Sequence, residues 1–168
     1  MFHIRNATID DSKAILDIYA PYITDTCVSF ETQVPTIGEF RLRVKEIINS
    51  YPYIVCEDGN DIIGFAYASR HRERAAYKYS AEVSVYVSPA YHRCGIGKSL
   101  YMELFELLKT QDVCMVFAGI TLPNDKSVGL HKAFEFKEVG VYHNAGYKFG
   151  EWLDVLWMEK LIRKPLHL

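Results

Sequence analysis

The sequence of 168 residues predicts an α/β (α+β) fold, with a mixed, mostly antiparallel central sheet flanked by helices. Two observations predict it. Segments of helical and of strand-like apolar periodicity alternate in the order β-α-α-β-β-β-α-β-α-β-β. A turn at Asp58-Gly59 joins two neighbouring strand-like segments, which indicates an antiparallel hairpin in the front half. No linker, repeat or low-complexity tract interrupts the chain, so we expect a single domain over residues 1–168.

The first elements follow from local chemistry. Residues 2–9 are typical of a strand, and residues 10–12 then supply side-chain acceptors and negative charge that favour the start of a helix. Apolar residues at helical spacing continue this helix to Ile23, and we expect Pro21 to bend or shorten it.

The remaining elements alternate between the two periodicities. A second helix is expected over residues 36–49, a third after Gly95 and a short fourth over residues 124–134. Pro89 should end the long central strand, because proline cannot donate to a sheet ladder. The further strands are expected at residues 53–57, 62–68, 77–87, 113–122, 139–142 and 152–161.

Charge and cysteine content narrow the class of protein. A formal net charge of −2 argues against nucleic acid as the main partner, which requires a concentrated basic surface. The four cysteines are far apart and the histidines show no metal-ligand spacing, so we expect no metal. The N-terminus lacks a signal-peptide pattern and no apolar run reaches the roughly 18 residues of a membrane span, so we expect a cytoplasmic protein without a membrane partner.

A glycine-containing turn follows the long strand. Within residues 83–100 a strand ends, the chain turns through Gly95 and Gly97, and a helix begins. A helix N-terminus presents unpaired backbone N–H groups that attract phosphate, and Arg93 and Lys98 add positive charge. A turn without any ligand is the alternative.

Two nucleotide-binding motifs fail at this turn. A dinucleotide fingerprint would need glycine at residue 100, where Leu100 stands. A P-loop would need glycine at residue 92, where His92 stands. The phosphate ligand is therefore expected to be of another kind.

The segment His92-Arg93-Cys94-Gly95-Ile96-Gly97 resembles the coenzyme A signature of the GNAT acetyltransferase superfamily. In that signature arginine or glutamine, two residues, glycine, one residue and then glycine or alanine follow a strand, so histidine at the first position is a departure. Residues 120–124 and the helix after them resemble the family's next strand, asparagine and helix, although Glu135 stands where glycine is frequent. Nearly the whole chain resembles most closely the phosphinothricin and methionine sulfoximine acetyltransferases, in residues 29–32, 72–79, 81–82, 85–89, 122–125, 130–131 and 150–155.

The resemblance implies a GNAT-like three-layer domain, acetyl-CoA as the co-substrate and, by analogy with the subgroup, a homodimer. It implies transfer of the acetyl group to the amine of a small amino-acid-like molecule, by direct attack in a ternary complex. The thioester oxygen is expected to accept a backbone N–H from the end of the strand at residues 85–87. The expected cofactor contacts are Val85, Tyr86, Val87, Arg93, Cys94, Gly95, Ile96, Gly97, Lys98 and Asn124. Asn124 is equally suited to cap the helix that follows it.

Two side chains are candidates for acid–base chemistry. The resemblance implies that Glu82 removes a proton from the amine, directly or through water, because an ammonium group cannot attack a thioester. His131 stands where many family members carry a tyrosine that protonates the departing thiolate, and an imidazolium is suited to that role. The alternatives are a solvent-facing strand residue at Glu82 and a helix-surface histidine at His131. Tyr86 and Tyr142 are further candidates for the acid.

A basic and aromatic stretch, residues 69–79, is the candidate for the substrate side. Arginine offers a planar fork that matches a carboxylate, so Arg72 and Arg74 are expected to hold the carboxylate of the substrate. The full set of candidate substrate-binding residues is Phe30, Glu31, Arg72, Arg74, Tyr77 and Tyr79, with Glu31 near the substrate ammonium. A solvated hairpin end is the alternative for the basic stretch.

Two other functions remain open at this point. A peptide N-terminal or lysine acetyltransferase would need an open groove, and a non-catalytic acyl-CoA sensor could dispense with Glu82. Trp152, Trp157 and Tyr147 are expected in the core or at a subunit interface, where aromatic residues are enriched.

Overall fold

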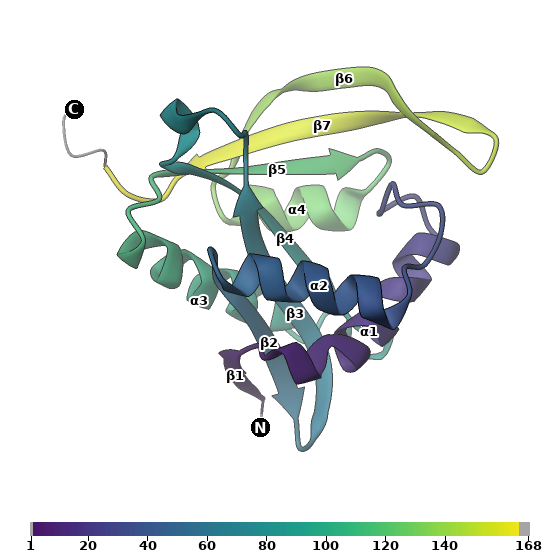
Figure 1. The fold of residues 1–168 in the computed structure, drawn as a ribbon. Coiled ribbons are helices and arrows are strands. Elements are labelled where there is room, and N and C mark those ends of the chain that lie inside the picture. Colours follow the sequence, from purple (N-terminus) through teal and green to yellow (C-terminus); the bar gives the residue numbers. More distant parts are fainter. Residues whose placement is uncertain (1, 165–168) are drawn as a thin grey trace.

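The computed structural model describes residues 2–164, in which a sheet carries helices on both faces (Figure 1). Met1 and residues 165–168, the ends of the predicted domain, lie outside the described residues. The strands are β1 (His3–Asn6), β2 (Tyr53–Asp58), β3 (Asp61–Arg70), β4 (Ser80–Val87), β5 (Met115–Thr121), β6 (Lys137–Lys148) and β7 (Glu151–Leu161). The helices are α1 (Ser12–Thr24), α2 (Ile37–Ile48), α3 (Ile96–Thr110) and α4 (Asp125–Ala133), with short 3₁₀ turns at Ile9–Asp11, Ala75–Tyr77 and Pro89–Tyr91.

The strands form one mixed sheet within residues 2–164, in the order β1-β2-β3-β4-β5-β7-β6. Every neighbouring pair is antiparallel except β4 and β5, which are parallel. A parallel pair needs a crossover connection, and α3 supplies it by leading the chain from the end of β4 back to the start of β5. The predicted order of elements and the predicted fold class are therefore confirmed.

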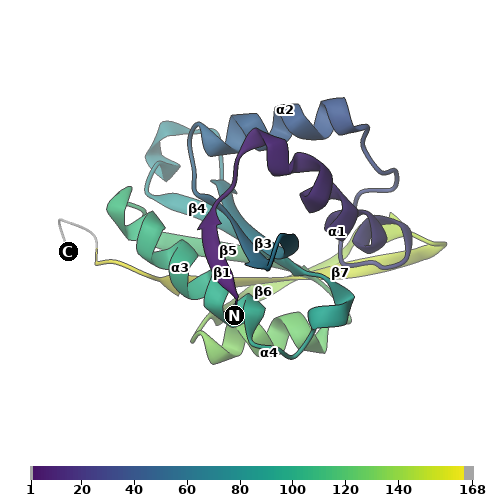
Figure 2. The ribbon, with the colours of Figure 1, turned by 90° about the horizontal axis from the view of Figure 1, so that it is seen from below.

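The helices cover both faces of the sheet, which gives three layers (Figure 2). α1 and α2 pack on one face, where Tyr53, Val55 and Phe65 are buried. α3 packs on the opposite face, against Ile54 and Val83. Successive side chains of a strand point to opposite faces, and in β2 and β3 both faces are covered by helices. These strands are therefore apolar on both sides and form nearly continuous apolar runs in the sequence.

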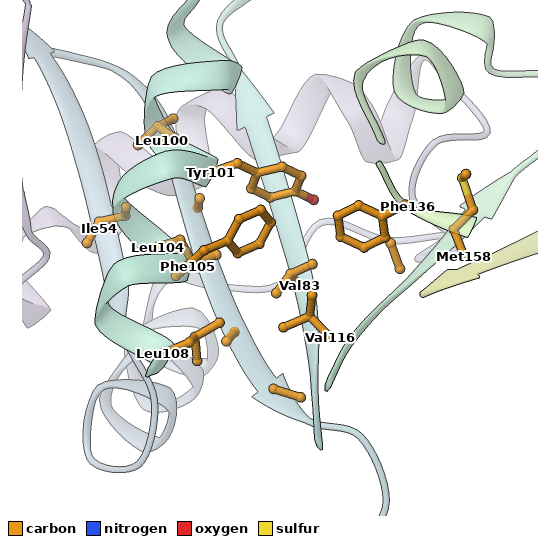
Figure 3. Packing of buried hydrophobic residues seen from close by; sticks show 14 of the residues in the cluster. Ile54, Val83, Leu100, Tyr101, Leu104, Phe105, Leu108, Val116, Phe136 and Met158 are labelled. Carbon is orange, nitrogen blue, oxygen red and sulfur yellow. The ribbon is translucent and has the colours of Figure 1, made fainter. Parts of the chain in front are cut away.

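The larger core lies between α3 and the sheet (Figure 3). Leu100, Leu104 and Leu108 follow one another at four-residue spacing, so they form one stripe along α3, and all three are fully buried. Burying one such side chain contributes about 1.5–3 kcal/mol. Tyr101 and Phe105 continue this face toward the end of α4, where both rings contact the edge of Phe134. This packing fixes α3, and the glycine turn before it, against the sheet.

The N-terminal elements differ in their limits from the predicted ones. β1 is shorter than residues 2–9, because Ile9–Asp11 already forms a 3₁₀ turn. α1 continues through Pro21 to Thr24, so the expectation that this proline shortens the helix is wrong. Pro21 lies in the last turn of α1, where its missing N–H removes a single backbone hydrogen bond.

Two strands also differ in length. β4 begins at Ser80 and not at Tyr77, because the ladder with β3 ends at the pair Arg70↔Ala81 and residues 71–79 must connect the two strands. β6 extends over Lys137–Lys148 and pairs with β7 almost along its whole length. Glycines and polar residues interrupt the apolar alternation of β6, which is why its length was underestimated.

Glu135 occupies a position that favours glycine. Its φ is +61°, and it follows α4 in the arrangement of a Schellman motif, in which the N–H of Phe136 donates to the carbonyl of His131 and the N–H of Glu135 to that of Lys132. We expect Glu135→Gly to raise the free energy of unfolding by about 0.5–1 kcal/mol, measured by urea denaturation. The ion pair with Lys160, at 3.5 Å and largely exposed, contributes little. Glu135→Ala is the control: it removes the same ion pair but keeps the strain, so an equal gain with alanine would contradict this explanation.

Candidate active site

Strands β4 and β5 are paired only at their beginnings. Their register runs from Ser80↔Met115 to Glu82↔Phe117 and ends there. Beyond this point a hollow of about 400 Å³, counting the open space at its mouth, lies between the strands. Its lining consists of Val28, Val83, Ser84, Val85, Tyr86, Tyr101, Ala118, Gly119, Ile120, Thr121, Asn124, Ser127 and His131. Separated strands offer backbone N–H and C=O groups to a ligand that lies between them.

The N-terminus of α3 lies next to β4 and α4, both of which contribute residues to this hollow. Gly95 caps the helix with a φ of +80°, a left-handed conformation that glycine adopts without side-chain strain. Gly97 lies so close to β4 and α4 that a Cβ atom there would contact Leu130, Val87 and Val85 at 3.6 to 3.9 Å. The first N–H groups of α3 are therefore held near the end of β4, and unpaired N–H groups of this kind are suited to an anion.

The side chains of the glycine turn divide into two groups. Arg93, Cys94 and Lys98 are exposed, so they are free to meet a ligand in front of the helix. Ile96 is buried in the core under α3 and offers only its backbone N–H. Of the predicted cofactor contacts in this turn, the side chains of Arg93, Cys94 and Lys98 are therefore accessible to a ligand, whereas the side chain of Ile96 is not.

His92, the departure from the coenzyme A signature, holds the end of β4. Its Nε2 lies 3.1 Å from the carbonyl oxygen of Val87 and 3.1 Å from the hydroxyl oxygen of Tyr22. Tyr22 donates its own hydroxyl proton to the same carbonyl at 2.6 Å. Because a carbonyl oxygen only accepts, Nε2 carries a proton. The histidine therefore has a structural contact of its own.

Asn124 lies at the start of α4 and at the hollow. Its Oδ1 accepts a hydrogen bond from the backbone N–H of Ser127 at 3.1 Å, so the capping role is confirmed. The residue also lines the space between β4 and β5. Its contact with a cofactor remains a prediction.

His131 is buried, with 3% of its surface exposed, so the helix-surface alternative is wrong. Its Nδ1 lies 2.7 Å from the carbonyl oxygen of Ser127, and its Nε2 lies 3.0 Å from the hydroxyl of Tyr101. Since the carbonyl only accepts, Nδ1 carries the proton and Nε2 accepts from Tyr101. Burial lowers the pKa of His131, and the Ser127 carbonyl opposes this only in part. The resting ring is therefore neutral and not the expected imidazolium.

Glu82 is the last residue of β4 that pairs with β5, so it stands at the point where these two strands separate, while β4 remains paired with β3 up to Val87. Its Oε1 lies 3.0 Å from Nδ1 of His71. The Glu82 side chain is 31% exposed, so the carboxylate is held on one side and open on the other. Side chains alternate along β4, so Glu82 shares a face with Ser84 and Tyr86. A base that meets an incoming amine needs this combination of support and access.

A second hollow, of about 350 Å³, lies between the α1–α2 layer and the sheet. Its lining consists of Tyr19, Glu31, Phe40, Arg43, Val44, Ile47, Tyr53, Phe65, Tyr67 and Tyr86. Tyr86 borders both hollows, so they adjoin on the Glu82 face of β4. Glu31 is one of these lining residues, but its Oε1 already accepts hydrogen bonds from Arg43 at 2.7 Å and Tyr19 at 3.0 Å.

The loop that carries Phe30 and Glu31 is fastened to the β6–β7 hairpin. Lys148 is 4% exposed, and its Nζ donates to the carbonyl oxygens of Thr26 at 2.8 Å and Ser29 at 2.6 Å. Burial lowers the pKa of Lys148. These contacts join residues that are roughly 120 positions apart in the chain. They fix the loop that carries Glu31, one of the residues that line the second hollow.

The Phe30 ring packs directly against Gly146, where there is no side chain. A Cβ atom at residue 146 would lie 2.3 Å from Cε2 of Phe30, which no packed structure tolerates. We expect Gly146→Ala to displace the ring and raise KM for the amine about three- to tenfold, with the Kd of acetyl-CoA unchanged, as measured by steady-state kinetics and calorimetry. In a Phe30→Ala background the same change should have no further effect. An additive effect there would show that Gly146 acts by another route.

Residues Arg72, Arg74, Tyr77 and Tyr79 all lie exposed on the β3–β4 connection. None of them lines either hollow. Tyr77 alone is linked to the site, since its ring packs edge-on against His71 at 5.6 Å. The structure therefore does not bring the two arginines together with Glu31, and it leaves them exposed on the connection that also carries His71.

Four residues that contribute to the site carry no signal of that role in the sequence. Tyr101 lies within the leucine stripe of α3, Arg43 and Lys148 are typical of surface charges, and His71 is one of several polar residues in the basic stretch 69–79. No pairwise pattern in the sequence connects these residues with Glu82, Glu31 or His131, because the contacts form only when separate strands and helices pack.

Residues 2–164 contain no group of three His, Cys, Asp or Glu side chains arranged for a metal ion. None of the helices in this part of the chain is long and apolar enough to cross a membrane. The cysteines Cys27, Cys56, Cys94 and Cys114 are all free thiols.

Comparisons with known proteins agree with this geometry. Residues 4–157 match a family model described as an acetyltransferase (GNAT) domain. The chain is 37% identical over 162 residues to phosphinothricin N-acetyltransferase from Streptomyces viridochromogenes, covering 96% of this chain and 88% of that protein. It is 30% identical over 161 residues to the L-methionine sulfoximine/L-methionine sulfone acetyltransferase of Pseudomonas aeruginosa, covering 93% and 92%.

A solved structure completes the comparison. The phosphinothricin acetyltransferase of Sinorhizobium meliloti in complex with AcCoA superposes with a TM-score of 0.92 at 32% identity, over 99% of this chain and 94% of that one. Fold and site together define an N-acetyltransferase. The chain belongs to the GNAT acetyltransferase family, as the coenzyme A signature predicted.

Proposed function

We propose that this enzyme transfers the acetyl group of acetyl-CoA to the amine of a small amino-acid-like substrate of the phosphinothricin or methionine sulfoximine type, by direct attack in a ternary complex. One observation carries the proposal: the strands β4 and β5 separate directly after Glu82, and the hollow that lies between them adjoins the second hollow at Tyr86. A thioester and an amine that enter from the two sides meet beside this carboxylate.

The cofactor is assigned to the N-terminus of α3. The amides of Gly95, Ile96 and Gly97 take the pyrophosphate, and Arg93 and Lys98 add positive charge. The pantetheine arm runs between β4 and β5 past Asn124, and the thioester oxygen accepts a backbone N–H from residues 85–87. The relative from Sinorhizobium meliloti, whose structure contains AcCoA, supports this choice of cofactor.

The reaction needs one proton removed and one supplied. Glu82 takes a proton from the ammonium group, directly or through water, and the neutral amine then attacks the thioester carbonyl. The C–N bond forms, the C–S bond breaks, and coenzyme A leaves as a thiolate. We assign its protonation to His131, which takes up a proton from solvent at Nε2, where it accepts a hydrogen bond from Tyr101, and passes it to the thiolate, while the proton on Glu82 is released to solvent.

The acceptor is held by residues around the second hollow. Glu31 lines this hollow, and we assign its neighbour Phe30 to the same side. Arg72 and Arg74, on the exposed β3–β4 connection, hold the substrate carboxylate through their planar forks. Tyr77 and Tyr79 flank the arginines. Two relatives are named as acetyltransferases of phosphinothricin and of L-methionine sulfoximine, and this supports an acceptor of the same class.

We further propose a cytoplasmic homodimer in which residues 1–168 form one domain. Four large aromatic side chains, Tyr142, Tyr147, Phe149 and Trp152, are more than half exposed on the β6–β7 hairpin, which favours a partner surface there. The free thiols fit a reducing compartment.

The experiment that tests the proposed function is a thiol-release assay with acetyl-CoA and a panel of amines. We expect L-methionine sulfoximine and phosphinothricin to be acetylated faster than peptides or lysine side chains. Preference for peptides would overturn the substrate class. Binding of acetyl-CoA without turnover of any amine would favour a sensor and overturn the enzymatic role.

A further inference from the structure

His71 lies directly beyond the end of β3 and has no part in the proposed function. β3 and β4 are paired up to Ser69↔Glu82 and Arg70↔Ala81, so the connection back to β4 begins at residue 71. The imidazole thereby reaches Glu82, with Nδ1 3.0 Å from Oε1. A contact of this length within an active site is a charge-assisted hydrogen bond.

The ring of His71 is held by aromatic side chains from three other elements. It stacks on Phe117 of β5 with ring centres 4.2 Å apart and planes 13° from parallel. Trp157 of β7 contacts it edge-on at 6.3 Å, and Tyr77 contacts it edge-on at 5.6 Å. Only 10% of the His71 side chain is exposed. A ring confined in this way has one orientation, in which Nδ1 faces the carboxylate.

We infer that His71 is a positioning residue for the proposed base: its Nδ1–H donates to Oε1 of Glu82 and leaves Oε2 directed at the incoming amine. This inference rests on the proposed function. The proton removed from the ammonium group passes to Glu82, and His71 keeps its own proton throughout. Fixing one carboxylate oxygen limits the side-chain rotation that a partly exposed glutamate otherwise has, so the base is oriented before the amine arrives.

Two substitutions separate the hydrogen bond from the packing. His71→Asn places an amide N–H near the position of Nδ1 but loses most of the stacking, whereas His71→Phe keeps the stacking on Phe117 and loses the donor. With L-methionine sulfoximine as the amine and saturating acetyl-CoA, we expect His71→Phe to lower kcat about tenfold and His71→Asn to retain kcat within about threefold of the native enzyme. The Kd of acetyl-CoA should not change in either variant.

The same variants in a Glu82→Gln background make the test specific. If His71 acts through Glu82, His71→Phe should have no further effect on kcat there. A purely structural role predicts the reverse pattern: phenylalanine active, asparagine impaired, and additive losses in the double variant. Any of these three results would overturn the inference. If His71→Phe does not fold, His71→Leu, which is also apolar and has no donor, is measured in its place.

Failure of this inference is distinguishable from failure of the proposed function. In the first case the native enzyme acetylates the amine and the two His71 variants do not differ as expected. In the second case the native enzyme already shows no thiol release with any amine.

Discussion

Replacing Glu82 with glutamine is expected to lower kcat about 10²- to 10³-fold while the Kd of acetyl-CoA stays unchanged. Glutamine has nearly the same size and can still accept a hydrogen bond from His71, but it cannot take up the proton of an ammonium group. The loss should therefore fall on the chemical step and not on binding. Steady-state kinetics with L-methionine sulfoximine, together with calorimetric titration of acetyl-CoA, would measure both quantities.

A matched control for this substitution is Glu103→Gln, the same chemical change on the exposed side of α3. It should leave kcat at the native value. If Glu82→Gln retains kcat within about threefold, a different group or bulk water removes the proton, and the assignment of the base is wrong.

Replacing Gly97 with aspartate is expected to weaken acetyl-CoA binding at least about 100-fold without lowering the thermal midpoint of unfolding. A Cβ atom fits there, since its nearest neighbour would be Leu130 at 3.6 Å, an ordinary contact. A carboxylate in the first turn of α3 complements the unpaired N–H groups of the helix and stabilises the empty protein. The same carboxylate repels the pyrophosphate that the amides of this turn are proposed to bind.

Gly97→Asn separates charge from size, because asparagine and aspartate occupy nearly the same volume. Asparagine should weaken binding far less than aspartate does. Equal losses for the two variants would mean that steric exclusion explains the effect, and an unchanged Kd with aspartate would place the pyrophosphate elsewhere. Calorimetry and thermal unfolding of the same samples provide the two measurements.

The cofactor side could be predicted from the sequence because its determinants are local. The glycines at 95 and 97 are two residues apart and sit between a strand and a helix whose periodicities are easy to recognise. Backbone amides at a helix terminus follow from that order of elements alone. The side-chain contacts there, such as the bond from His92 to the Val87 carbonyl, required the structure.

The acceptor side could not be predicted in the same detail, since its contacts join distant parts of the chain. Nothing in the sequence indicates a partner for the Glu31 carboxylate, yet the packing of α2 brings Arg43 into hydrogen-bonding contact with it. The environment of His131 also depends on packing: burial against α3 gives it Tyr101 as a partner and disfavours the charged ring. Such effects depend on which faces of helices and strands meet.

The ladder between β4 and β5 is the shortest in the sheet, and beyond it the two parts of the sheet are separate. In the proposed complex acetyl-CoA lies across that gap and ties β1–β4 to β5–β7, so ligand occupancy would add directly to conformational stability. At a concentration one hundred times its Kd, the co-substrate contributes about 2.7 kcal/mol. Cellular acetyl-CoA supply would thus govern the lifetime of this enzyme against proteases as well as its rate.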